Sequence, residues 1–114
     1  MPPRRNPLQF NSLQLKTLTL LQEIARLPDY SRPGEESGSV FLTGLPSPHG
    51  DHFHLGEAIV AARDATGLRN PAVWAALERR GFVRRSPAGG AVLTAEALAY
   101  DTGLRQTILK KPAE

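Results

Sequence analysis

The sequence contains no cysteine, no apolar run long enough to span a bilayer, and none of the common enzyme motifs. The lack of cysteine excludes a disulfide framework and thiolate chemistry, which is compatible with a cytosolic protein. The first five residues, MPPRR, also lack the apolar core of a signal peptide. We therefore expect a cytoplasmic protein without a membrane segment.

The sequence contains few residue patterns that would indicate an enzyme. A glycine-rich phosphate loop followed by lysine is absent, and so is the nucleophile elbow of the hydrolases. Glu57 and Asp64 lie seven positions apart on a predicted helix, so their carboxylates do not meet as a catalytic pair. We predict that the protein is not an enzyme and carries no cofactor.

The residues that are present fit one small basic domain. The chain has 114 residues, with 14 Lys and Arg against 11 Asp and Glu, for a net charge of +3. This charge permits a nucleic-acid partner without indicating one. We expect a disordered basic arm at residues 1–9, a folded domain at 10–103 and a tail at 104–114. Arg4 and Arg5 in the arm would contact phosphates or remain solvated, and the second interpretation is the simpler one.

The first predicted helix begins at a capping box. Asn11 is a good N-cap with Gln14 three residues later, and Phe10 precedes it as a hydrophobic staple. Pro28 ends the helix, so we expect it to extend to Leu27. Its leucines occupy more than one helical stripe, which leaves two interpretations. Either the helix closes the core of the domain, or its spare face pairs two chains as a homodimer.

A β-hairpin is predicted after this helix. Residues 29–38 form a charged loop, residues 40–43 and 52–55 resemble strands, and residues 46–51 form the turn between them. All three histidines of the protein, His49, His52 and His54, lie here beside Asp51. Imidazole and carboxylate groups are ligands for zinc and related ions. The simpler interpretation is a solvated turn without a metal.

Two helices and a second hairpin are predicted downstream. Alanines between residues 58 and 65 indicate a short helix, and Gly67 lies in the turn that follows. Asn70 and Pro71 then begin a helix over residues 70–80, which Gly81 ends. Residues 82–85 and 91–93 flank a turn-rich loop as a hairpin, and Thr94 caps a last helix that extends to Tyr100.

The order of these elements resembles a known family. TGLRNPAVWAALERRGFVRR, a glycine-rich loop and VLTAEALAYD are together similar to the core of winged helix-turn-helix proteins, especially the bacterial regulators of the multiple-antibiotic-resistance type. The resemblance covers the C-terminal half of the chain. It implies a recognition helix at 70–80 and a wing at 82–93. The expected fold is therefore α+β, a winged helix-turn-helix over residues 10–103 with an additional β-hairpin between the first and second helices.

This resemblance implies binding to double-stranded DNA and a role in transcription regulation. The planar guanidinium of arginine binds two phosphate oxygens at once. We expect Arg69 and Asn70 to approach the bases and the later arginines to hold phosphates, although a solvated charged face is the alternative. The candidate DNA-binding residues are Arg69, Asn70, Arg79, Arg80, Arg84 and Arg85.

The predicted recognition helix has few side chains that read bases. It exposes Pro71, Ala72, Trp74 and Glu78, whereas base-reading helices usually expose Arg, Asn, Gln or Ser. An alternative function is therefore a winged-helix protein-protein interaction module that does not bind DNA. Trp74 would be its anchor, because exposed tryptophan is common at the centre of interfaces. A ring folded against the domain itself is an equally good interpretation of Trp74.

Overall fold

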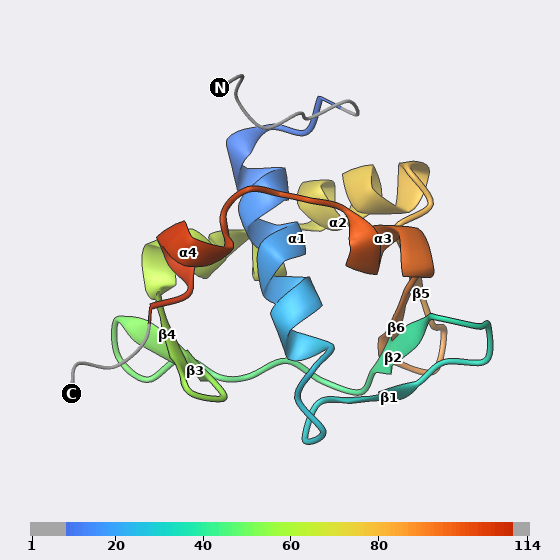
Figure 1. Ribbon diagram of the computed structural model, residues 1–114, viewed down its shortest axis with the longest axis horizontal. Helices are drawn as coiled ribbons and strands as arrows, with labels where there is room; N and C mark the ends of the chain where they lie inside the picture. The colour runs from blue at the N-terminus through green and yellow to red at the C-terminus, as the bar shows by residue number, and fades with distance from the viewer. Residues whose placement is uncertain (1–8, 111–114) are drawn as a thin grey trace.

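The computed structural model describes residues 9–110 (Figure 1). Residues 1–8 of the predicted arm, with Arg4 and Arg5, and residues 111–114 of the predicted tail lie outside this range. Helix α1 (Ser12–Ile24) has the predicted capping box, since Asn11 Oδ1 accepts from the Gln14 N–H at 2.8 Å and Gln14 Oε1 from the Asn11 N–H at 2.9 Å. The start of this helix is therefore confirmed.

Helix α1 ends three residues earlier than predicted. After Ile24 the backbone tightens, because the N–H groups of Arg26 and Leu27 bond to carbonyls three residues back. The Ser31 hydroxyl lies 2.8 Å from the Leu27 carbonyl and 3.0 Å from the Ala25 carbonyl, and so satisfies two groups at the helix end. The helix therefore ends because Ser31 in the following segment bonds to carbonyls at its end, and not because of Pro28 alone.

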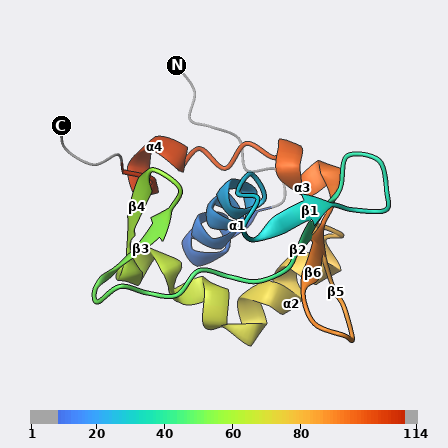
Figure 2. The same cartoon turned by 90° about the horizontal axis from the view of Figure 1, so that it is seen from below.

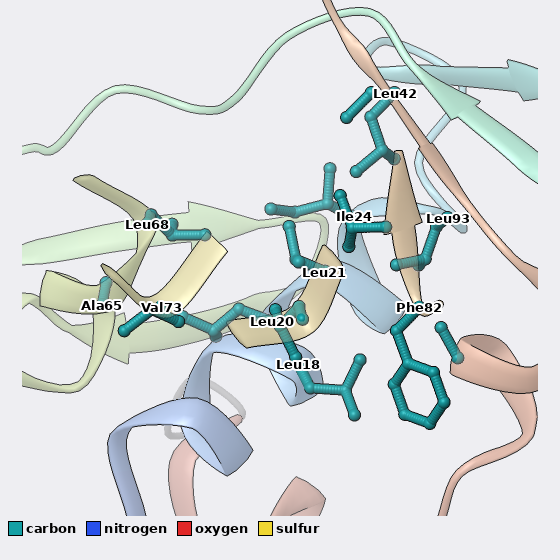
Figure 3. Packing of buried hydrophobic residues seen from close by; sticks show 14 of the residues in the cluster. Leu18, Leu20, Leu21, Ile24, Leu42, Ala65, Leu68, Val73, Phe82 and Leu93 are labelled. Carbon is teal, nitrogen blue, oxygen red and sulfur yellow. The ribbon is translucent and has the colours of Figure 1, made fainter. Parts of the chain in front are cut away.

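Helix α1 lies at the centre of the molecule. The two sheets lie on opposite sides of it, with α2 on one flank and α3 and α4 on the other (Figure 2). Residues 17–22 are all buried, as is Ile24. In Figure 3 the leucines of α1 separate Leu68 and Val73 on one side from Leu42, Phe82 and Leu93 on the other. The rest of the same chain thus covers the α1 leucines that suggested a homodimer. Helix α1 presents no separate apolar face through which two chains could pair.

The predicted pairing of residues 40–43 with 52–55 is wrong. Strand β2 (Val40–Leu42) pairs instead with β1 (Ser31–Pro33) on one side and with β6 (Ala91–Leu93) on the other. Strand β5 (Val83–Arg85) completes an antiparallel sheet of order β1-β2-β6-β5. Strand β1 lies in the segment expected to be a loop. The other partner of β2, strand β6, is about fifty residues away in the sequence, and local patterns carry no information on such a pairing.

The predicted helix that begins at Ala58 is also wrong. Residues Ala58–Ala61 form strand β4, which pairs with β3 (His52–Leu55) across a two-residue turn. Gly56 has φ +62° at the first turn position, where glycine is favoured in tight hairpins. Phe53, Leu55 and Val60 are buried against the core. A hairpin between the first two helices therefore exists, but it comprises residues 52–61.

A 3₁₀ helix, η1 (Ala62–Arg69), follows β4 and leads directly to α2. Gly67 was expected in a turn, but it lies inside η1 and against α1. A Cβ atom at Gly67 would come within 1.8 Å of Thr17 Oγ1, so glycine permits the close approach of the two helices. The predicted helix-turn-helix thus begins with a 3₁₀ helix in place of an α-helix.

The C-terminal third agrees more closely with expectation. Helix α2 (Pro71–Arg79) begins at the Asn70 cap, the β5 and β6 strands form the predicted hairpin, and α3 (Ala95–Ala99) begins at the Thr94 cap. A short helix α4 (Arg105–Ile108) then packs on the domain. Ile108 is only 2% exposed, and Lys110 pairs with Ile59 of β4. Residues 104–110 therefore belong to the folded unit.

The fold is an α+β domain of helices and antiparallel sheets. Within residues 9–110, no helix has both the length and the apolar character needed to cross a membrane.

Candidate nucleic-acid interface

Helix α2 begins at a side-chain cap and packs on the domain through one buried face. Asn70 Oδ1 accepts from the Ala72 N–H at 3.0 Å, and Pro71 occupies the first turn, where its missing N–H costs nothing. Val73, Ala76 and Leu77 are buried, as predicted from helical spacing. Pro71, Ala72 and Arg79 face outward and are exposed. The exposed surface of α2 is therefore small and mostly apolar, with arginines at its two ends.

The capping bond changes the role expected for Asn70. An asparagine that reads adenine uses its side-chain oxygen and nitrogen together. In this structure the oxygen is engaged by the backbone at the start of α2. Arg69 is then the remaining base-edge candidate of the two residues predicted there, and it is exposed at the end of η1.

Trp74 is half-buried and belongs to the edge of the core. Its indole N–H donates to the Leu68 carbonyl at 2.9 Å, which fixes the ring against the end of η1. The ring also lines a hollow of about 300 Å³ between α2, the wing and residues 42–45. Trp74 is thus folded onto its own domain, where its indole N–H is fixed by the end of η1.

An ion pair joins the wing to α2. Arg85 on β5 donates to Glu78 Oε1 through Nε at 3.1 Å and through a terminal nitrogen at 2.5 Å. This hydrogen bond lowers the pKa of the Glu78 carboxyl, and the same pair raises the pKa of Arg85. Both groups lie at the surface, so the pair is accessible to competing ions.

Arg84 has a second carboxylate partner. Its guanidinium bonds to Glu36 in the loop between β1 and β2, and both side chains are more than half exposed. No local sequence pattern predicts this contact, because the two residues are 48 positions apart. Of the four arginines at the helix end and the wing, two therefore have an acidic partner in an exposed pair.

The other predicted arginines lie at the ends of α2. Arg69, Arg79 and Arg80 are all exposed. In the part of the chain that the structure describes, neither Arg69 nor Arg79 forms an ion pair. Arg69 and Arg79 flank a nine-residue helix, which is about 14 Å long. The structure thus brings Arg79, Arg80 and Arg85 to the junction of α2 and β5. Arg84 lies on the opposite face of β5, beside Glu36, and Arg69 lies at the other end of α2.

The histidines lie together at a different place, on the β3–β4 hairpin. His52 Nε2 and His54 Nε2 are 3.1 Å apart, and the His49 ring lies 5.3 Å from the His54 ring between centroids. Asp51 Oδ1 lies 3.2 Å from His52 Nδ1, and this hydrogen bond lowers the pKa of the Asp51 carboxyl. Among residues 9–110, no group of three or more His, Asp or Glu side chains, in the positions that they occupy in this structure, could hold a metal ion.

The fold and this surface define an α+β domain with an arginine-rich junction between a helix and a β-hairpin. Comparison of the chain with protein-family models, with curated proteins and with solved structures found no match. The resemblance to winged helix-turn-helix regulators therefore remains a prediction.

Proposed function

We propose that this chain is a small cytoplasmic protein that binds double-stranded DNA and regulates transcription. The observation that supports this best is the junction of α2 and the wing. Three exposed arginines, Arg79, Arg80 and Arg85, lie there, and the Arg85–Glu78 pair ties β5 to α2, so that helix and wing adjoin. A surface of this kind suits the regularly spaced phosphates of a duplex.

Phosphate contact would replace the two carboxylate contacts. Glu78 and Glu36 each hold one arginine in an exposed pair, and such pairs contribute little in water. A phosphate group accepts hydrogen bonds from the same guanidinium groups, and its neutralisation releases condensed counterions from the DNA. Each carboxylate therefore competes with DNA for its arginine, and binding to the duplex exchanges one partner for another.

The binding should depend weakly on base sequence. The outward residues of α2 include Pro71 and Ala72, which offer no hydrogen bond to a base edge. Asn70 is engaged in its cap, which leaves Arg69 as the main base-edge candidate. Contacts to phosphate position a protein on DNA without carrying sequence information.

The test is binding of the full chain to a random-sequence duplex across a salt series, followed by fluorescence anisotropy of labelled DNA. We expect affinity to fall with salt, and Arg79→Ala to reduce the log-log salt slope by about 0.9. Glu78→Gln should strengthen binding, because it frees Arg85 from its carboxylate partner. Arg26→Ala is the matched control, since Arg26 is an exposed arginine at the far end of α1.

Two results would contradict the proposal. One is the absence of binding at about 10 mM salt, where surface charges are least screened. The other is an equal loss of affinity in Arg79→Ala and Arg26→Ala, since the effect would then follow net charge alone.

The alternative of a protein-interaction module is supported by the hollow beside Trp74. Leu42, Leu68 and Trp74 line it together with Leu45, which is 38% exposed and is the one exposed large apolar side chain of residues 9–110. A complex formed here would persist at about 1 M salt, where the Debye length is about 3 Å. Loss of a salt-resistant complex in Leu45→Ala, with Arg79→Ala unaffected, would favour this alternative.

A further inference from the structure

The histidine-rich end of the β3–β4 hairpin is not used by the proposed DNA contact. His52 and His54 are two residues apart on β3, so their side chains leave the same face of the strand. His49 forms an antiparallel bridge with His52, with N–H···O distances of 2.6 and 3.3 Å. Residues directly opposite in such a pair also share a face. Backbone geometry thus directs all three imidazoles of the protein to one side.

The other side of the strand anchors this arrangement. Phe53 and Leu55 alternate with the histidines and are buried in the core. The Ala62 N–H donates to the Asp51 carbonyl at 2.8 Å, which ties the histidine turn to the start of η1. His49 and His54 are exposed and His52 is half-buried. The backbone that carries the imidazoles is therefore fixed, and the exposed His49 side chain can change its rotamer at the surface.

The distances within the cluster suit one small transition-metal ion. Two nitrogens bound to Zn²⁺ at about 2.0–2.1 Å, with an angle between them of about 90–109°, lie about 2.9–3.4 Å apart. His52 Nε2 and His54 Nε2 are 3.1 Å apart. The His49 ring lies 5.3 Å from the His54 ring and 6.2 Å from the His52 ring, so rotation of its side chain can bring a third nitrogen to the same ion.

Asp51 prepares His52 for this role. Its carboxylate accepts from His52 Nδ1, which leaves the lone pair of that ring on Nε2, facing His54. A carboxylate that orients a metal-bound histidine in this way is a common feature of zinc sites. Without an ion, the tautomer of His54 that carries its proton on Nε2 matches this lone pair. With an ion, the His54 proton moves to Nδ1 of the same ring, and both Nε2 atoms present lone pairs.

We propose that His49, His52 and His54 form a binding site for a single divalent transition-metal ion of the imidazole-preferring class, such as Zn²⁺. Two ligands are preset and the third closes on the ion, with water completing the coordination. Imidazole ligands favour Zn²⁺, Ni²⁺ and Cu²⁺ over Mg²⁺, which prefers oxygen. The site is independent of the arginine surface, so it stands or falls without the proposed DNA binding.

The experiment is isothermal titration calorimetry of the full chain with ZnCl₂, and with MgCl₂ as a control ion. We expect one Zn²⁺ per chain and no heat from Mg²⁺. His52→Gln and His54→Gln should each weaken binding at least about tenfold, because each removes a ligand. His49→Gln should weaken it as well, but by less than either of the others. Glu57→Gln, an exposed change in the adjacent turn, should leave it unchanged.

Imidazole NMR signals supply a second readout that does not depend on heats. Signals of all three rings should shift on addition of Zn²⁺, and circular dichroism should show that each variant is folded. Zinc binding that persists in the double variant H52Q/H54Q would overturn the proposal, as would the absence of saturable binding. An unchanged affinity in His49→Gln would overturn the assignment of His49 as the third ligand.

Discussion

At the scale of single residues, Gly67 sets how closely η1 approaches α1. A methyl group there would meet the Thr17 hydroxyl, which is itself held at 2.8 Å from the Leu13 carbonyl. We expect Gly67→Ala to lower the free energy of unfolding by about 1–3 kcal/mol, as overpacking does in tightly packed interiors. Urea denaturation measures this change.

Gly44 provides the control for that substitution. It also has a negative φ, but no atom lies within 4 Å of the position of its missing Cβ. Gly44→Ala should therefore leave stability unchanged or raise it by about 0.4–1 kcal/mol, through the entropy of the unfolded chain. Equal destabilisation by both substitutions would contradict the role assigned to the contact between Gly67 and Thr17.

Glu78 and Arg85 give a prediction on pH. The hydrogen bond from Arg85 lowers the pKa of Glu78 in the folded protein, so the unfolded state binds a proton at a higher pH than the folded state does. The contribution of this pair to stability is then present above the unfolded pKa and lost as pH falls through the folded pKa. NMR titration of the Glu78 carboxyl should give a pKa below about 4.3, and Arg85→Gln should return it toward that value.

Residue-level features were predictable where their partners are local. The Asn11, Asn70 and Thr94 caps were all identified from the sequence, because each bonds to a backbone N–H two or three residues away. The partner of Arg84 is 48 residues away and follows from sheet topology, which no local pattern encodes. The arginines could therefore be identified from the sequence, but their carboxylate partners could be identified only in part.

At the scale of elements, the start of α2 depends on its cap. Asn70→Ala removes the acceptor of the Ala72 N–H and should cost about 0.5–2 kcal/mol of stability. Asn70→Ser retains a capping oxygen and should cost less. Thermal unfolding followed by circular dichroism compares the two variants. A loss in Asn70→Ser as large as that in Asn70→Ala would show that a property of asparagine other than capping is needed.

Strand β4 and the pairing of β2 were both mispredicted, because a local apolar pattern does not fix either of them. Ala58, Ile59, Val60 and Ala61 form an apolar run that fits a buried strand as well as a helix, and periodicity does not separate the two. Gly56 decides in favour of the strand, because its positive φ folds β4 back along β3. For β2, the partner β6 comes from a distant part of the sequence, and this pairing is made by the packing of the whole sheet.

At the scale of the whole molecule, the ends of the described chain meet around α1. Phe10, Phe82 and Tyr100 form a cluster with ring centroids 5.4–5.6 Å apart, and Arg105 pairs with Glu23 at 2.9 Å. Ile108 fills the core between α4 and the rest of the domain. The C-terminal segment therefore contributes to stability as a structural part of the domain.

Truncation of Ile108 tests that conclusion. Ile108→Ala should lower the free energy of unfolding by about 2–5 kcal/mol, because it leaves a cavity in the core. Leu45→Ala, at an exposed apolar side chain, should change it by less than about 0.5 kcal/mol. Calorimetry should show a single transition in both variants, as expected for a small domain with one core. A separate transition for residues 104–110 would contradict this view.

The enclosure of α1 has a consequence for how the protein is made. Its Gln22 amide bonds to the carbonyls of Ala97 and Tyr100, and its Thr19 hydroxyl lies 2.6 Å from that of Thr102. A ribosome that adds about 5–20 residues per second needs roughly 4–17 s to proceed from Ile24 to Ile108. The leucines of α1 therefore leave the ribosome before the C-terminal segment that covers them has been synthesised and released. Among the described elements, α1 is thus synthesised first and is among the last to be covered.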